Sequence, residues 1–479
     1  MEAERVSLEN ALTLAKLLNR TLLVPPVRFG NAIPYISFDK LHLRLNQATK
    51  DGLLHCRNYD EYGILPRECI DFFDWTLVSW DLLVDTTLIE ETMQQPIVDR
   101  WNGTLEWLED NLGIREDEDI YAFKDDVMYQ FRYYDSEEDT EPLEKFEKRI
   151  QIADLKLLHD YRLLHVGSLF GTSRLRTIEE DSWEVRSAFR QAMVFRNPAL
   201  DAITNAMRDR LGGLAGYYGV HFRVGDGIFL KQARKNAFTI FRTLLHSKMK
   251  LSDDIVDQLV RLNAPELLAS EAPSSFAEEQ TVHEEVVQDR EAAHEAVEMP
   301  AEDDSPAPRL RKRASNSRPQ RPGAYKHAFP KPIPPIRQRS DSPLDPSLKC
   351  RGPLYPPDSP YIKLNAPLFL ATDSRIPTAD PNLAIFFKSF PCTFVLSDFG
   401  SSPYNSQPIE TLHQLEAWRN MDDHVPLAPF LYPIVDMMVA AKARAIVGTP
   451  QSTFSRFAID VLHQSYHGQS NKLRIDNVI

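Results

Sequence analysis

Between Leu8 and Leu18 the apolar residues recur three and four positions apart, which predicts a helix with one face against a core. Ser7 is a residue type that can cap the start of this helix. A short apolar run at residues 21–24 then predicts a buried strand, and the two prolines that follow end it because their rings cannot continue a strand ladder. A helix followed by a short strand is the rhythm of an α/β fold.

The first half of the chain continues this rhythm, and a long helical segment leads out of it. Residues 151–170 alternate in the same way between helical and strand-like patterns. From Ile178 to Leu211 the pattern is mostly helical, which suits a segment that bridges two halves. We therefore expect an N-terminal domain over residues 1–205 and a C-terminal domain over residues 206–479.

The second half contains four apolar runs that are typical of buried strands. They are residues 217–223, 367–371, 393–396 and 445–447. Helical patterns alternate with them, among them the stretch from Leu427 to Lys442 and the stretch from Ser452 to His463. Strands that alternate with helices predict a mostly parallel sheet, with ligands bound at the carboxyl ends of its strands.

Residues 264–349 differ in composition from both of their flanks. They are rich first in glutamate and then in arginine, serine and proline. Such a sequence cannot bury enough apolar surface to offset the conformational entropy that ordering it would cost. We expect a disordered insertion within the C-terminal domain, not a third domain.

Length and charge narrow the class of protein. A chain of 479 residues exceeds what one hydrophobic core usually serves, and its 43% of hydrophobic residues suit a globular enzyme. The net charge of -14 argues against nucleic acid as a partner, because binding a phosphate backbone requires a basic face.

The cysteines and the apolar runs give further information on the class of protein. The four cysteines, at positions 56, 69, 350 and 392, are too few and too scattered for a disulfide scaffold and lack the paired spacing of a zinc site. We expect no metal. No run of about 18 apolar residues occurs, and the first residues lack the apolar core of a signal peptide, so the sequence as it stands predicts a soluble chain without a membrane anchor.

His221 and Arg223 stand at the carboxyl end of the predicted strand 217–223, where strand alternation places both side chains on one face. A planar guanidinium can hold two phosphate oxygens at once, and Gly225 and Gly227 let backbone approach a ligand closely. These features indicate a site for a phosphate-bearing, nucleotide-like ligand. The alternatives are a hydrogen-bonded core histidine and an ordinary salt bridge between the halves.

Two further segments follow predicted strands. From Gly448 to Ser455 the chain runs through a glycine turn into a helix, whose free N–H groups would receive a phosphate, with Ser452 or Thr453 adding hydroxyl donors. The segment is not a Walker loop, because no Gly-Lys-Ser/Thr follows the glycine. Asp373 can accept hydrogen bonds from a base or a ribose. Plain helix capping is the alternative for both segments.

In their order along the chain, these segments resemble the motifs of the GDP-fucose protein O-fucosyltransferase-like family. The matching segments are His221–Asp226, Ala371–Ser374 and Gly448–Ser455. The opening stretch from Leu8 to Pro26 is similar to the first helix and strand of fungal members of that group. The resemblance covers both halves of the chain and skips the insertion.

The resemblance implies a GT-B-like α/β fold of two Rossmann-like domains, with the nucleotide held mainly by the second and no metal required. It implies transfer of fucose, with inversion, from GDP-fucose to a hydroxyl acceptor such as a protein serine or threonine. Arg223 would be the catalytic residue that binds the diphosphate and stabilises the charge on departing GDP. The implied GDP-fucose ligands are His221, Arg223, Asp226, Asp373, Ser452, Thr453 and Phe454.

Members of this family carry a glycine- and asparagine-rich loop before the first helix, which helps to form the sugar and acceptor site and runs into an arginine corresponding to Arg5. The present sequence starts at Met1 instead. We therefore expect either a domain truncated at its start or a catalytically impaired relative that acts as a GDP-sugar-binding or interaction protein. A transferase that uses another sugar nucleotide is a third alternative. The resemblance implies a place in the secretory pathway.

Overall fold

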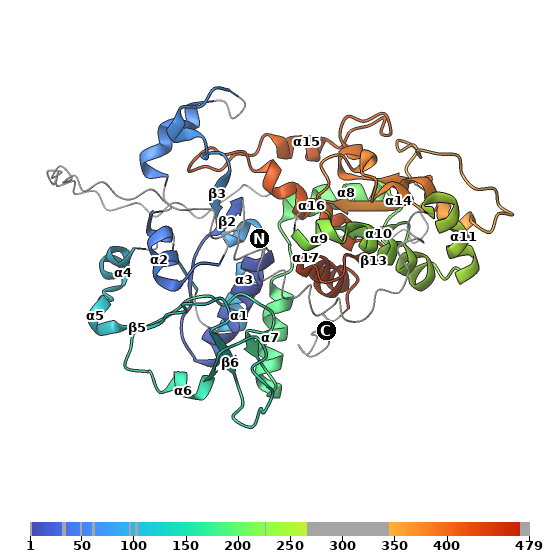
Figure 1. Ribbon diagram of the computed structural model, residues 1–479. Coiled ribbons are helices and arrows are strands. Elements are labelled where there is room, and N and C mark those ends of the chain that lie inside the picture. Colours follow the sequence, from blue (N-terminus) through green and yellow to red (C-terminus); the bar gives the residue numbers. More distant parts are fainter. Residues whose placement is uncertain are drawn as a thin grey trace. The chain divides into compact units, whose positions relative to one another are not determined.

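The computed structural model describes most of the chain (Figure 1). The chain divides into two compact units. The described residues are 2–30, 35–47, 50–59, 63–94, 97–100, 104–225, 227–265 and 344–469. Of these, the first unit holds those up to residue 222 together with residues 344–373 and 390–469, and the second unit holds residues 223–265 and 374–389. The fold is mixed α/β with parallel sheets, which confirms the predicted class.

A four-stranded parallel sheet forms the centre of the C-terminal part of the first unit, in the order β12, β11, β10, β13. Its strands are β10 (Tyr218–Phe222), β11 (Leu368–Thr372), β12 (Thr393–Phe394) and β13 (Ala445–Gly448). In register, Val220 of the central strand β10 lies between Leu370 and Val447. Every residue of β10 is buried, as expected for a parallel strand covered on both faces. All four apolar runs predicted in the second half therefore form strands.

Helix α16 (Ala428–Ala441) packs against β10, β11 and α8 (Pro198–Arg210). It is apolar on nearly all sides, which is the pattern of a buried helix. A Cβ atom added at Gly219 of β10 would lie only 2.3 Å from the carbonyl oxygen of Ala440, so glycine permits this close packing. With 14 residues α16 is too short to span a bilayer, and no other helix in the described ranges is long and apolar enough to do so.

The remaining elements of this part are short helices and the C-terminal helix. They are η6 (Ile362–Asn365), η8 (Leu396–Phe399), α15 (Glu410–Glu416), α17 (Thr453–Phe457), the π-helical η9 (Ala458–Leu462) and α18 (His463–Tyr466). The last three follow one another without a break, so a helical segment runs from Thr453 to Tyr466 directly after β13.

The N-terminal part of the first unit combines small sheets with helices. Its strands pair as β1 (Leu23–Val24) with β4 (Val98–Asp99), β2 (Val27–Gly30) with β3 (Trp75–Val78), β5 (Ile120–Phe123) with β8 (Leu163–Val166), and β6 (Phe131–Tyr134) with both β7 (Lys148–Gln151) and β9 (Leu175–Arg176). Only the β2–β3 pair is antiparallel among these. The helices are α1 (Glu2–Leu17), α2 (Phe38–Gln47), η1 (Asp51–Asn58), η2 (Arg67–Cys69), η3 (Trp80–Leu82), α3 (Thr86–Met93), α4 (Leu105–Leu112), α5 (Glu116–Asp119), α6 (Ile152–Lys156) and α7 (Glu180–Ala192).

The first helix begins earlier than the sequence pattern predicts. Helix α1 starts at Glu2, so Ser7 lies inside the helix and does not cap it. The residues before Ser7 include Glu4 and Arg5, which are strong helix formers and extend the helix upstream. The strand and helices predicted after it are present, since β1 lies within residues 21–24 and α7 and α8 occupy most of the stretch from Ile178 to Leu211.

Glu9 of α1 is a buried carboxylate that is bound by three arginines. Its oxygens accept hydrogen bonds from Arg5 at 2.9 Å, from Arg186 at 3.2 Å and from Arg190 at 3.1 Å. Burial opposes ionisation, but the charges of Arg190, Arg5 and Arg186 outweigh it and hold the pKa of Glu9 well below its usual range. This ionic cluster joins α1 to α7 inside the first unit.

All four cysteines are paired, in the disulfides Cys56–Cys69 and Cys350–Cys392. The first disulfide joins η1 to η2 across a sequence separation of 13, and the second spans a separation of 42. A closed loop restricts the unfolded chain, so each bond stabilises the fold. The spacing of the cysteines in the sequence does not indicate this pairing.

The second unit is helical in the described ranges. Its elements are α9 (Gly227–Lys231), α10 (Ala233–Arg242), the π-helical η4 (Thr243–Lys248), α11 (Asp253–Asn263), η7 (Pro377–Ala379) and α14 (Ala384–Ser389). The ring of Phe386 lies 5.8 Å from the ring of Phe241, and the amide of Asn263 donates a hydrogen bond of 2.8 Å to the hydroxyl of Ser389. These contacts join α14 to α10 and α11, so two distant segments of the sequence form this unit together.

The predicted insertion extends too far at its C-terminal end. Residues 266–343 lie outside the described residues, whereas residues 344–349 belong to the folded first unit. Leu348 is 5% exposed and packs in the core, and the backbone amide of Asp345 donates to the carbonyl of Arg210. The two apolar side chains Leu344 and Leu348 anchor this stretch, although its overall composition resembles that of the insertion.

Candidate functional site

The carboxyl ends of three neighbouring strands bring the predicted polar residues of the first unit to one edge of the sheet. His221 of β10 pairs in register with Ala371 of β11 and with Gly448 of β13. Asp373 follows β11 directly, and the turn after Gly448 leads to Ser452 at the start of α17. The sequence predicts this placement, because the carboxyl ends of parallel strands meet at a common edge.

His221 is held in place by Ser455. Its side chain is buried, and its Nδ1 lies 2.6 Å from the Ser455 Oγ, which also accepts the backbone N–H of Thr449 at 3.1 Å. The Ser455 hydroxyl can donate its own hydrogen to Nδ1, because a hydroxyl carries one donor and two acceptor lone pairs. In the tautomer of neutral His221 that accepts this hydrogen, the ring proton is on Nε2, and this nitrogen is a donor suited to a phosphate or carbonyl oxygen.

Gly448 allows the helix to approach the strand end. A Cβ atom at this position would lie 2.6 Å from the Cβ of Ser455 and 3.0 Å from its Oγ. The side chain of Ser455 therefore occupies the space that a side chain at position 448 would need, and this close approach lets its hydroxyl reach His221. The glycine in the predicted turn is needed for space between β13 and α17.

Ser452 caps the helix that follows. It is fully buried, and its Oγ accepts the backbone N–H of Ser455 at 3.3 Å. Capping, one of the two roles considered for Ser452, is thus the contact its side chain makes in this structure. Thr453 begins the helix and is half-buried, while the ring of Phe454 lies 5.0 Å from the imidazole of His221 at an angle of 54°.

Asp436 is a site residue that the sequence patterns did not single out. It lies in α16, is 8% exposed, and accepts the backbone N–H of Thr372 at 2.9 Å through Oδ2, next to Asp373 at the end of β11. Its Oδ1 has no hydrogen-bond partner within the described ranges. Burial raises the pKa of Asp436 well above its usual value, although the Thr372 N–H opposes this, so the neutral acid is favoured. It is the only acidic residue between Leu427 and Lys442, which is the signal that could have revealed it.

Three predicted site residues remain: Arg223, Asp226 and Asp373. Strand β10 ends at Phe222, and Arg223 is the first residue of the second unit, where its guanidinium carbon lies 4.6 Å from the ring centroid of Phe229. Alternation along β10 therefore does not place the side chain of Arg223 on the face that carries His221. Asp226 lies outside the described residues, and Asp373 is exposed as the last residue of its segment of the first unit. The assigned roles of these three residues stay predictions.

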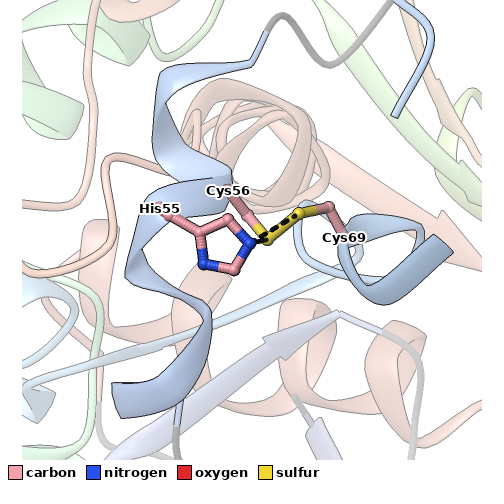
Figure 2. Close-up of side chains that lie close together, drawn as sticks. All are labelled: His55, Cys56 and Cys69. Atoms are coloured by element: carbon pink, nitrogen blue, oxygen red, sulfur yellow. Dashed lines mark hydrogen bonds between the residues drawn. A yellow bond between two sulfur atoms is a disulfide. The ribbon is translucent and has the colours of Figure 1, made fainter. Parts of the chain in front are cut away.

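A separate group in the first unit has the composition of a metal site. Potential ligand atoms of His55, Cys56 and Cys69 all lie within 4.8 Å of one another. Figure 2 shows the imidazole of His55 facing the disulfide between the two cysteines, with Nε2 3.7 Å from the Cys56 Sγ. Zinc binds cysteine as a thiolate, and disulfide sulfurs are not thiolates, so this group does not form a zinc site in its oxidised state.

Comparison with known proteins adds no relative to this picture. No model of a known protein family matches the chain, and no curated protein matches it.

Proposed function

We propose that this protein is a glycosyltransferase that moves fucose from GDP-fucose to a hydroxyl acceptor, with inversion at the anomeric carbon. The acceptor that the motif resemblance favours is a serine or threonine of a protein. The proposal includes a GT-B-like organisation with the nucleotide bound mainly by the C-terminal domain, and residues 266–343 as an insertion within it. The observation that carries the proposal is the cluster of His221, Thr449 and Ser455 at the carboxyl edge of a parallel sheet, where open α/β folds bind nucleotides.

The contacts proposed for the nucleotide follow from the chemistry of this edge. His221 supplies a ring N–H donor, and the turn from Gly448 to Ser455 supplies backbone N–H groups, and both suit phosphate oxygens. Phe454 lies beside His221 and offers an aromatic face on which a base can stack. The exposed carboxylate of Asp373 can accept paired N–H bonds from guanine, whereas adenine presents a different pattern.

The proposed reaction exchanges one bond at the anomeric carbon for another. The acceptor oxygen bonds to this carbon while its bond to the β-phosphate oxygen breaks, the bonding electrons leave with GDP, and the acceptor proton is released. Arg223 binds the diphosphate and stabilises the negative charge that develops there. A guanidinium does this with two parallel hydrogen bonds, a geometry that a single ammonium group cannot reproduce.

GDP release from GDP-fucose tests this reaction, with Arg223→Lys as the informative variant and Arg67→Lys, at an exposed arginine of η2, as its control. We expect Arg223→Lys to lower turnover by about 10²- to 10³-fold, as loss of a donor to transition-state charge does, and Arg67→Lys to have no effect. Near-parental turnover and nucleotide affinity in Arg223→Lys would show that the assigned role is wrong. Binding of GDP-fucose without turnover in the parental protein would instead support a GDP-sugar-binding protein.

Calorimetric titration with GDP and ADP tests how the base is read. If Asp373 reads guanine, Asp373→Asn weakens GDP binding by about 1.5 to 3 kcal/mol and leaves ADP binding nearly unchanged, because a charged hydrogen bond is lost. Unchanged GDP affinity would remove Asp373 from the site. Failure of the parental protein to bind GDP at all would overturn the nucleotide site itself.

A further inference from the structure

A cavity lies at the opposite edge of the same four-stranded sheet, inside the first unit. Its volume is about 290 Å³, and residues that line it include Arg196, Asp201, Arg208, Leu214, Lys442 and Tyr466. Leu214 precedes β10 and Lys442 precedes β13, so the cavity lies at the amino ends of these strands. The length of β10 puts about 13 Å between this edge and the edge that carries His221.

Two of the three cations in the cavity wall are matched by neighbouring acids. Lys442 is 3% exposed, and its ammonium donates to Asp201 at 2.7 Å, to Thr204 at 2.6 Å and to Asn205 at 2.9 Å. Arg208 binds the side chain of Asp209 at 2.8 Å. The Lys442 contacts hold α8 to the C-terminal end of α16, whereas the Arg208–Asp209 pair lies within α8.

The third cation, Arg196, has no such partner. It is exposed and directly precedes Asn197, whose side chain caps α8. Its guanidinium makes no hydrogen bond or ion pair within the ranges that the structure describes. A positive charge that no acid neutralises therefore stands beside two ion pairs, of which only Lys442 contributes a fully buried cation, in a chain whose net charge is -14.

Burial disfavours the charged form of Lys442 relative to its neutral form. Burial lowers the pKa of Lys442 to about 8, with the carboxylate of Asp201 opposing the shift and Arg208 adding to it. Asp209 of α8 and the ring of Tyr466, 4.9 Å away, also face the ammonium. An anion in the cavity would lower the free energy of the protonated lysine.

We propose that this cavity binds a compact oxyanion, the phosphate group of a small molecule, with Arg196 as its direct ligand and Lys442 and Arg208 as electrostatic support. A guanidinium matches two phosphate oxygens, and the side chains of Asn205 and Ser465 in the wall add neutral polar groups. One water occupies about 30 Å³ of liquid, so the cavity has room for a small group attached to the phosphate. This site does not depend on fucose transfer, because it shares no residue with the edge that carries His221.

Calorimetric titration with inorganic phosphate tests the proposal in three variants whose folding is verified by thermal unfolding. Arg196→Gln should weaken phosphate binding about tenfold or more, as loss of a charged hydrogen bond does. Ser465→Asp should weaken it too, because it adds a carboxylate to the cavity wall. Arg67→Gln, which removes an exposed arginine of η2, should leave binding unchanged.

The two edges of the sheet can be distinguished in the same titration. Ser455→Ala changes the edge that carries His221, so the part of phosphate binding that depends on Arg196 should persist in it. Absence of phosphate binding, or equal binding by the parental protein and Arg196→Gln, would overturn the proposal. Glycerol 3-phosphate distinguishes the source of the phosphate group, since tighter binding than that of inorganic phosphate indicates a phosphorylated metabolite and equal binding indicates the free ion.

Discussion

The Nδ1 of His221 and the hydroxyl oxygen of Ser455 lie 2.6 Å apart, although 234 residues separate them in the chain. The same hydroxyl accepts the backbone N–H of Thr449, so one side chain joins the end of β10 to the turn after β13. This contact fixes the orientation of the imidazole. Phe454, whose ring lies beside it, is then placed by the same helix.

Ser455→Ala should weaken GDP binding about tenfold, because His221 loses the partner that orients it. The free energy of unfolding should fall by about 1 to 3 kcal/mol, since Nδ1 is left buried without this partner, although the Thr449 amide keeps its hydrogen bond to the carbonyl of His221. Calorimetry and urea unfolding measure the two effects. Ser389→Ala is the control, because it removes a buried hydroxyl bonded to Asn263 and should lower stability while GDP affinity stays unchanged.

Gly448→Ala should disturb the same contact by steric overlap. The added Cβ would lie 2.6 Å from the Cβ of Ser455, so α17 must shift away from β13. We expect a loss of about 1 to 3 kcal/mol in unfolding free energy, together with weaker GDP binding. Gly400→Ala is the matched control, because the nearest atom to its added Cβ is 3.9 Å away. Equal stability of the two variants would show that the helix start can relax without cost.

Periodicity alone locates the strands and helices that carry this site. The apolar runs around Val220 and Leu370 are short and bounded by turn residues, and the stretch from Leu427 to Lys442 has helical spacing, so each was assigned correctly. The placement of His221, Asp373 and Gly448 at one edge also follows, because parallel strands share their direction. Strand ends are less well defined, and Arg223 falls one residue beyond its strand.

Contacts between distant residues were not predictable in this way. Ser455 is one of several hydroxyls after Gly448, and its link to His221 depends on the distance between β13 and α17, which no local pattern encodes. The hydrogen bond from the Thr372 amide to Asp436 likewise depends on how α16 lies against β11. The disulfide Cys350–Cys392 joins segments that become neighbours only when the sheet has formed. Residue types suggest chemistry, but packing decides which side chains meet.

Two deletions test where the predicted insertion ends. Replacing residues 266–343 with a short flexible linker should leave the melting temperature within a few degrees, since the composition of this segment offers no core. Extending the deletion to residue 349 should lower the melting temperature clearly, because it removes the buried Leu348 and the backbone contact from Asp345 to Arg210. A large fall with the shorter deletion would show that residues 266–343 contribute packed contacts.

Asp436 should make the protein less stable as the pH rises from about 4 towards neutrality. In the unfolded chain its carboxyl ionises near its usual pKa of about 4, whereas burial raises the pKa of Asp436 well above that value in the folded protein. Between these two values the folded state binds one more proton than the unfolded state. The free energy of unfolding therefore falls with rising pH, by up to about 1.4 kcal/mol per pH unit from this group alone.

Asp436→Asn isolates this contribution. An asparagine can keep the hydrogen bond from the Thr372 amide but cannot ionise, so the stability of the variant relative to the parental protein should increase as the pH rises from 4 to 8. Urea unfolding across this range measures the difference, and Asp110→Asn, at an exposed position of α4, gives the control. If the parental protein and Asp436→Asn show parallel pH curves, Asp436 ionises in the folded state as readily as in the unfolded chain. An Asp436→Leu variant completes the test, because it removes the acceptor for the Thr372 amide and should lower stability at pH 4, where the parental carboxyl is neutral in the folded protein.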